Sequence, residues 1–147
     1  MIDDREKTFP ISTELINRLC DRNFGIGADG LILLQNDNEL DFRMVYFNSD
    51  GNESTMCGNG GRCIIRFAND LDVASDKMTF NAIDGLHHGV VDGKVIRLQM
   101  IDVNEVEDHD RYLFMNTGSP HHVEFVDNVE SVNVYEEGKT IRNGAPY

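Results

Sequence analysis

A cysteine flanked by glycines is the feature of this sequence with the clearest chemical potential. Cys57 stands in the run Met-Cys-Gly-Asn-Gly-Gly-Arg-Cys at residues 56–63, where an apolar periodic segment predicts a helix from Gly61 to about Leu71. Glycines let the backbone fold tightly, and the first turn of a helix presents unpaired N–H donors and a partial positive charge. Such a place suits an anion, for example a substrate carboxylate, and favours a Cys57 thiolate that can act as a base.

The same residues also have a simpler interpretation. A glycine-rich turn can lead into a core helix, with Cys57 and Cys63 as small apolar side chains. A disulfide between the two is unfavourable, because the intervening helix would turn through about 600° and separate the side chains. We expect Cys63 to be packed on its helix and Cys20 to lie in the core. The residue types alone leave both interpretations open.

The histidines do not indicate a metal site. His87–His88 and His121–His122 are adjacent pairs, and neighbours on a strand point to opposite faces of a sheet. Because no cysteine or histidine spacing matches a zinc site, we predict no metal. His121 can supply a polar group in a cleft and Asn48 opens a turn after a strand, but a surface histidine and an ordinary turn residue explain them equally well.

Composition excludes several classes of protein. The 147 residues carry 26 Asp and Glu against 13 Lys and Arg, a net charge of −13. This charge would repel nucleic-acid phosphates and anionic membrane surfaces, so we expect neither partner. Three cysteines, an odd number, favour a reducing compartment over a disulfide framework. Since no apolar run reaches the about 18 residues of a membrane span and no apolar leader is visible, we expect a cytoplasmic protein.

The segments that must position these residues have the patterns of helices and strands. They predict an α/β chain. A first helix is expected after Ser12, ending by Asn23 to Gly25, and a second from Gly61 to about Leu71. Strands are expected at 31–34, 41–47, 78–82, 87–91, 94–100, 112–115 and 122–126. The acidic residues concentrated in 102–110 mark the best candidate for a domain boundary.

Four motifs together resemble the diaminopimelate epimerase family. They are Asn-Phe-Gly-Ile-Gly-Ala-Asp-Gly at 23–30, Tyr-Phe-Asn-Ser-Asp-Gly-Asn-Glu at 46–53, the cysteine motif at 56–63 and Gly-Ser-Pro-His at 118–121. Their order and spacing agree along nearly the whole chain, and the cysteine motif with the preceding Asn-x-Asp-Gly is highly specific. The resemblance favours the interpretation of Cys57 as a reactive thiolate beside an anion site.

The resemblance implies an α/β (α+β) fold of two similar domains, each a mixed, mostly antiparallel sheet wrapped around a central helix. We expect a first epimerase-like domain at 1–101 that lacks its N-terminal strand, an acidic linker at 102–111, and the beginning of a second such domain at 112–147. The family's second catalytic cysteine and its early His-Gly-x-Gly-Asn-Asp-Phe stretch are not in this sequence. The chain is therefore expected to be a fragment that is inactive alone.

The activity implied by the resemblance is the interconversion of LL- and meso-diaminopimelate, a step toward lysine and cell-wall precursors, without pyridoxal phosphate or metal. One cysteine removes the α-proton and another delivers a proton on the opposite face. Cys57 resembles the first of these cysteines, and His121 resembles a histidine that tunes the thiol chemistry. Asn48 and the backbone amides of Gly58 and Asn59 resemble the substrate-binding groups. A homodimer is expected at full length.

Two residues depart from the family pattern. Ser119 replaces the usual asparagine before Pro-His, which alters one expected substrate contact. Gly30 stands where some members have glutamine, so that side-chain contact is absent.

Other activities fit the sequence less well. The nearest alternative is a proline or hydroxyproline racemase of the same fold, but those enzymes typically have histidine where this chain has Asn59. Cys57 disfavours a related isomerase that lacks catalytic cysteines, and the absence of Cys-x-x-Cys disfavours a thiol redox protein. A non-catalytic carboxylate-binding fragment remains an open alternative.

Overall fold

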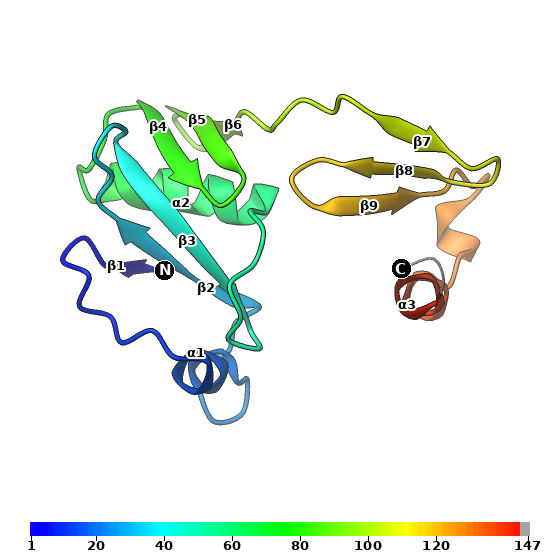
Figure 1. The fold of residues 1–147 in the computed structure, drawn as a ribbon, viewed down its shortest axis with the longest axis horizontal. Helices are drawn as coiled ribbons and strands as arrows, with labels where there is room; N and C mark the ends of the chain where they lie inside the picture. The colour runs from blue at the N-terminus through cyan, green and yellow to red at the C-terminus, as the bar shows by residue number, and fades with distance from the viewer. Residues whose placement is uncertain (145–147) are drawn as a thin grey trace.

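Two β-sheets organise the chain, whose residues 1–144 are described by a computed structural model (Figure 1). The first sheet has the order β1-β2-β3-β4-β5-β6, and its strands are Ile2–Asp3, Gly30–Gln35, Phe42–Asn48, Lys77–Ala82, Gly85–Asp92 and Val95–Leu98. The second sheet has the order β7-β8-β9, with strands Val106–Asp108, Leu113–Asn116 and Pro120–Val123. The helices are α1 (Thr13–Cys20), α2 (Gly58–Asp70) and α3 (Val134–Asn143), with a short 3₁₀ turn at Val129–Ser131.

The first sheet is mixed, as predicted. β1 pairs parallel with β2 and β3 pairs parallel with β4, whereas the pairs β2–β3, β4–β5 and β5–β6 are antiparallel. A parallel pair needs a long crossover connection, and α2 supplies the crossover between β3 and β4. The predicted mixed, mostly antiparallel sheet around a helix is therefore confirmed.

α2 packs on one face of the first sheet and carries much of its core. Ile64, Ile65 and Ala68 are fully buried and share a cluster with Phe42 and Phe80. The two phenylalanine rings are stacked with centroids 5.0 Å apart. Burial of each large apolar side chain stabilises a fold by about 1.5–3 kcal/mol, so this packing fixes α2 firmly on the sheet.

α1 lies on the opposite face of the sheet. Its buried residues Ile16 and Cys20 pack against Leu31 and Leu33 of β2, whereas Ile32 and Leu34 of the same strand face the α2 side. Side chains of a strand alternate between faces, so a strand covered on both sides reads as one continuous apolar run. This double burial explains why the run 31–34 predicts a strand without polar alternation.

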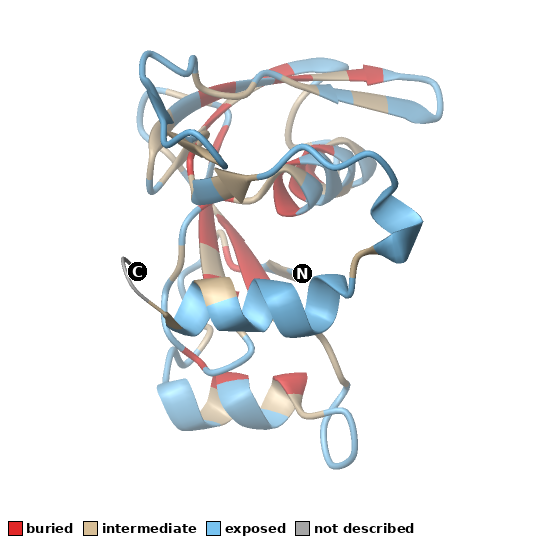
Figure 2. Cartoon of the chain, turned by 90° about the vertical axis from the view of Figure 1, so that its right-hand side faces the viewer, coloured by how far each residue is buried: buried red, intermediate tan, exposed pale blue. Residues whose placement is uncertain are grey.

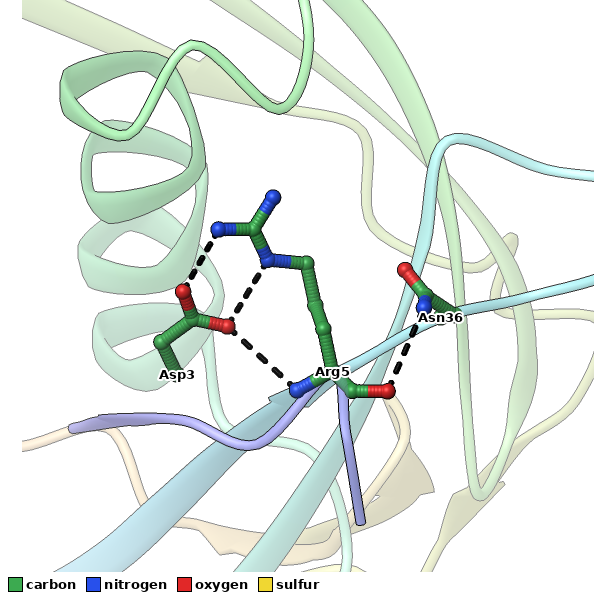
Figure 3. Close-up of polar contacts among 3 residues, drawn as sticks. All are labelled: Asp3, Arg5 and Asn36. Carbon is green, nitrogen blue, oxygen red and sulfur yellow. Dashed lines mark hydrogen bonds and ion pairs between the residues drawn. The ribbon is translucent and has the colours of Figure 1, made fainter.

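Polar contacts hold the N-terminal segment at the edge of the sheet (Figure 3). The Arg5 guanidinium donates from Nε and Nη2 to the Asp3 carboxylate at 2.8 and 2.6 Å, and the Asn36 side-chain amide donates to the Arg5 carbonyl at 3.2 Å. Buried Asp4 accepts from the side-chain amide of Gln35 at 2.8 Å. Because β1 is only two residues long, it has no periodicity from which the sequence could predict it.

α2 begins at Gly58 and not at Gly61 as predicted. The low helix propensity of glycine hides the first turn from sequence patterns. Packing overrides that propensity, because Gly60 and Gly61 are buried and a β-carbon on Gly61 would lie 2.6 Å from the Leu98 side chain. Glycine thus lets the helix start lie close against β6.

The C-terminal half differs more from the prediction. Residues 106–108 of the predicted acidic linker 102–111 form strand β7, paired antiparallel with β8, while the domain boundaries themselves stay predictions. β9 starts at Pro120, two residues before the predicted strand. α3 was not predicted, and residues 145–147 of the predicted second domain lie outside the described part of the chain.

The β8–β9 turn of the second sheet points toward the N-terminal end of α2 (Figure 1).

Within residues 1–144, no helix is long and apolar enough to cross a membrane.

Candidate active site

Cys57 is the N-cap residue of α2. Its backbone is extended, with φ −116° and ψ 145°, and its Sγ accepts a hydrogen bond from the Gly60 N–H at 3.1 Å. Its carbonyl accepts from the Gly61 N–H at 2.8 Å. The thiol thus takes the capping position that Ser, Thr, Asp or Asn usually fills. The positive end of the 13-residue helix and the N–H donor both stabilise negative charge on the sulfur.

The first turn of α2 provides the predicted amide donors. A helix N–H bonds to the carbonyl four residues earlier, and for Gly58 and Asn59 that residue lies outside α2. The backbone N–H groups of these two residues therefore have no partner within the helix. The Asn59 side chain is engaged elsewhere, because its Oδ1 accepts a hydrogen bond from Arg62. It lines a separate pocket with Arg62 and Cys63. An anion at this helix start would therefore meet backbone groups and not the Asn59 amide.

Asn48 ends β3 and opens a tight turn. Its N–H donates to the Asn52 carbonyl and its carbonyl accepts from the Gly51 N–H, both at 2.9 Å. Gly51 has φ +88°, a conformation that glycine adopts easily. The Asn52 N–H also donates to the Asp50 carboxylate at 2.9 Å, and this hydrogen bond lowers the pKa of Asp50. The turn that carries Asn48 is therefore well fixed.

Asn48 and Cys57 both line a cleft of about 660 Å³ between the two sheets. This volume lies within the range of small-molecule sites, about 300–1,000 Å³. The wall on the side of the first sheet includes Tyr46, Asn48, Thr55 and Cys57. The opposite wall includes Ser119 and His122 near the second sheet and Arg142 of α3.

The two walls are joined by a hydrogen bond. The hydroxyl oxygens of Thr55 and Ser119 lie 2.6 Å apart, and Thr55 comes two residues before Cys57. Ser119 is the residue that replaces the family's usual asparagine. In this structure its side chain contacts the loop that leads to Cys57, the candidate catalytic cysteine.

His121 is exposed and does not line this cleft. Its Nδ1 donates to the Ser119 carbonyl at 2.8 Å. The neighbouring His122 does line the cleft, and its ring stacks on Tyr112 with centroids 4.1 Å apart. Adjacent strand residues face opposite sides, so the pair can present only one ring to the cleft. The role predicted for His121 stays a prediction.

Tyr46 is a cleft residue that the sequence alone did not single out. A β-carbon on Gly30 would lie 2.6 Å from Tyr46 Cε2 and 2.8 Å from its hydroxyl, so the ring fills the space beside Gly30. Burial, and to a lesser degree the nearby Cys57, raises the pKa of the Tyr46 phenol. Its alternation with Phe42 and Met44 indicates only a core face, whereas the β2–β3 register, in which Tyr46 opposes Ile32, brings it beside Gly30.

The three cysteines have different surroundings. Cys20 is buried, as predicted, while Cys57 is partly exposed and all three thiols are free. Cys63 is exposed, so the expectation that it is packed was wrong. The buried stripe of α2 runs through residues 60, 61, 64, 65 and 68, and position 63 faces away from it. Among residues 1–144, no group of His, Cys, Asp and Glu side chains is arranged to hold a metal ion.

The chain belongs to the diaminopimelate epimerase family, whose model, described as diaminopimelate epimerase, matches residues 1–91. A diaminopimelate epimerase of Flavobacterium psychrophilum is 60% identical over 97% of this chain and 56% of the relative. One of Chlorobaculum tepidum is 38% identical over 97% of this chain and 59% of the relative. The chain thus spans little more than half the length of these curated relatives.

A solved structure shares the fold. The crystal structure of a Bacillus anthracis phenazine biosynthesis protein of the PhzF family aligns with a TM-score of 0.65. The alignment covers 87% of this chain and 49% of that protein at 15% sequence identity. This likeness supports the fold alone.

Proposed function

We propose that this chain is part of a diaminopimelate epimerase, an isomerase of lysine and cell-wall precursor synthesis, and that Cys57 is one of its two acid/base thiols. The observation that carries the proposal is the Cys57 thiol at the start of α2, on the same cleft as Asn48. Homologues named diaminopimelate epimerase support this assignment.

The chemistry follows from the position of the thiol. The substrate α-carboxylate would accept hydrogen bonds from the N–H groups of Gly58 and Asn59, where the helix dipole favours an anion. A Cys57 thiolate would then remove the α-proton, while negative charge developing on the substrate is stabilised by fixed donors. Inversion needs a proton donor on the opposite face, which we assign to a second cysteine of the complete protein. Asn48 would hold another polar group of the substrate.

The proposal includes the organisation and setting of the protein. We assign residues 1–101 to a first domain, 102–111 to a linker and 112–147 to the start of a second domain. Diaminopimelate is the proposed small-molecule partner, and the complete protein is proposed to be a cytoplasmic homodimer that uses no cofactor. His121 is proposed to act on the thiol chemistry. Because His121 is exposed, this effect would have to pass through the turn that contains Ser119.

Replacement of Cys57 in the complete protein tests the assignment. We expect Cys57→Ala to lower the rate of α-proton exchange with deuterated solvent by at least about 10²–10⁴-fold, the usual contribution of a positioned acid or base. Cys63→Ala is the matched control, because Cys63 lies on the same helix but outside the cleft, and it should keep full activity. Full activity of Cys57→Ala would refute the catalytic role.

Alkylation distinguishes thiolate character from mere access. Cys63 is more exposed than Cys57, so exposure alone predicts faster modification of Cys63. A thiolate stabilised at the helix start predicts faster modification of Cys57. Brief treatment with iodoacetamide followed by peptide mass mapping measures both, and equal labelling of the three cysteines in the folded protein would count against the proposal.

A further inference from the structure

A buried Asp–His pair lies outside the residues that line the cleft and outside those assigned to catalysis. The His87 side chain is fully buried in β5, and Asp84, in the β4–β5 turn, is 13% exposed. His87 Nε2 lies 3.0 Å from Asp84 Oδ1, and its ring stacks on Phe80 with centroids 5.3 Å apart. His87 also lies 3.2 Å through Nδ1 from the Gln99 carbonyl.

These contacts make the two side chains one unit. A carbonyl oxygen can only accept, so His87 Nδ1 carries a proton toward Gln99. Nε2 faces Asp84 Oδ1, so the imidazole ring is held at both of its nitrogens. Loss of His87 would leave a buried carboxylate without its partner, which is unfavourable.

The second carboxylate oxygen reaches the other sheet. Asp84 Oδ2 is buried and has no hydrogen-bond partner within the described residues. It lies 3.0 Å from the position that a β-carbon on Gly118 would occupy, and Gly118 has φ +102°. Gly118 belongs to the β8–β9 turn, so this carboxylate lies beside a turn residue where a side chain would be crowded and the backbone conformation favours glycine.

The same turn carries one wall of the cleft. The residue after Gly118 is Ser119, whose hydroxyl lies 2.6 Å from that of Thr55. The turn therefore approaches the first sheet at two places: Gly118 lies beside the Asp84 carboxylate, with no room between them for a side chain, and Ser119 hydrogen-bonds to the loop just before Cys57. Movement of the turn away from Asp84 would also move Ser119 away from Thr55 and widen the cleft.

We propose that Asp84, held in place by His87, is a positioning residue that seats the β8–β9 turn and so sets the closure of the cleft at Cys57. Its effect on epimerisation rests on the proposed function. Its effect on the distance between Thr55 and Ser119 does not depend on that function. The proposed function and the positioning role of Asp84 can therefore fail separately.

A disulfide between positions 55 and 119 measures that distance. Hydroxyl oxygens 2.6 Å apart place the two side chains within reach of a disulfide, so Thr55→Cys with Ser119→Cys should cross-link in oxidised glutathione. The complete protein is used, with Cys57, Cys63 and the proposed second acid/base cysteine replaced by serine so that no accessible thiol competes, whereas Cys20 is buried. The rate of cross-linking reports the effective concentration of one thiol at the other.

Four backgrounds test the role of Asp84. Asp84→Ala should slow the cross-link about tenfold, because the effective concentration falls when the turn is released. Asp84→Asn should keep the cross-linking rate of the parent, since an amide can donate to neutral His87 Nε2 and has nearly the same shape as the carboxylate. Asp92→Ala is the matched control, because Asp92 also precedes a glycine in a hairpin but forms only an exposed pair with Arg97 at 2.9 Å. Gly118→Ala, which acts from the other side of the contact, should also slow the cross-link and replaces Asp84→Ala if that variant does not fold.

Equal cross-linking rates for Asp84→Ala, Gly118→Ala and the parent would overturn the positioning role. In the epimerase assay, made with the native cysteines, Asp84→Ala should lower kcat more than it changes KM, and Asp84→Asn should restore it. If the wild-type complete protein shows no epimerase activity, the proposed function fails while the cross-linking result still decides the role of Asp84. Loss of stability alone would lower the melting temperature without changing the cross-link in the folded protein.

Discussion

The two sheets of this chain are built from similar elements but are buried very differently. The buried apolar side chains of the first region, residues 2–98, come from both helices, from four of the six strands (β2 to β5) and from Met56. In the second region, residues 106–144, no apolar side chain is buried, and Phe125, Val134 and Tyr135 are 85%, 63% and 73% exposed. Figure 2 shows this contrast between the buried stripe of α2 and the exposed surface of α3.

The difference shows what each region contributes to the site. Caps and strand pairing are enough to define α3 and the second sheet locally, since Asn133 caps α3 and the β7–β8–β9 register is regular. A fixed position also needs packing, which only the first region supplies from its own residues. The first region therefore holds the thiol rigidly, whereas the second region positions its wall through contacts such as those at Gly118 and Ser119.

Truncation of one apolar side chain in each region should give the largest difference. Ile64→Ala removes a fully buried side chain of α2 and should lower the free energy of unfolding by about 2–5 kcal/mol. Val134→Ala removes a mostly exposed side chain of α3 and should change it by no more than about 0.5 kcal/mol. Urea unfolding followed by circular dichroism measures both, and similar losses would mean that the second region has a core of its own.

Removal of the helix caps gives a smaller contrast. The Ser12 hydroxyl accepts from the Leu15 N–H at 3.1 Å, and Asn133 Oδ1 accepts from the Glu136 N–H at 3.2 Å. Ser12→Ala should lower the free energy of unfolding by about 1 kcal/mol, because α1 is packed on the core. Asn133→Ala should reduce helix content in α3 and leave the main unfolding transition unchanged. An equal shift of that transition would contradict the separation of the two regions.

The same contrast explains which elements the sequence could predict. α2 was predicted because its buried residues Ile64 and Ala68 recur at helical spacing, but its glycine-rich first turn was not. α3 buries no side chain, so it lacks the apolar stripe on which prediction depends, although Asn133 at its start was a usable capping signal. β2 was predicted from its apolar run alone.

For the candidate site, the sequence could predict groups whose chemistry is local. Cys57 was singled out from its glycine neighbours and the helix that follows, whereas Asn48 was assigned to the site only by the resemblance to the family. Tyr46 depends on the register between β2 and β3, and Asp84 depends on how closely the two sheets approach. Neither property is encoded in local spacing, and the same holds for His122, which lines the cleft without having been singled out from the sequence.

An alkaline titration tests the first-region wall of the cleft and should give the smallest effect. Burial is the main reason why the pKa of Tyr46 is raised, and Cys57 adds to it. When the folded pKa of a group exceeds its unfolded value, its stabilisation is complete below the unfolded value, about 10 for tyrosine, and is lost as the pH rises through the folded value. We therefore expect the wild-type protein to lose stability above about pH 10 and Tyr46→Phe to lose less.

Urea midpoints measured at several pH values between neutral and strongly alkaline would show this difference. Tyr135→Phe is the matched control, since it removes an exposed phenol of the second region and should leave the alkaline loss in place. Cys57→Ala should reduce the loss only in part, because burial and not the thiol is the larger cause of the raised Tyr46 pKa. If Tyr46→Phe and wild type lose stability in parallel, the Tyr46 ring is not held against Gly30 in a water-poor wall. The rigid part of the cleft wall on the side of the first region would then not include Tyr46.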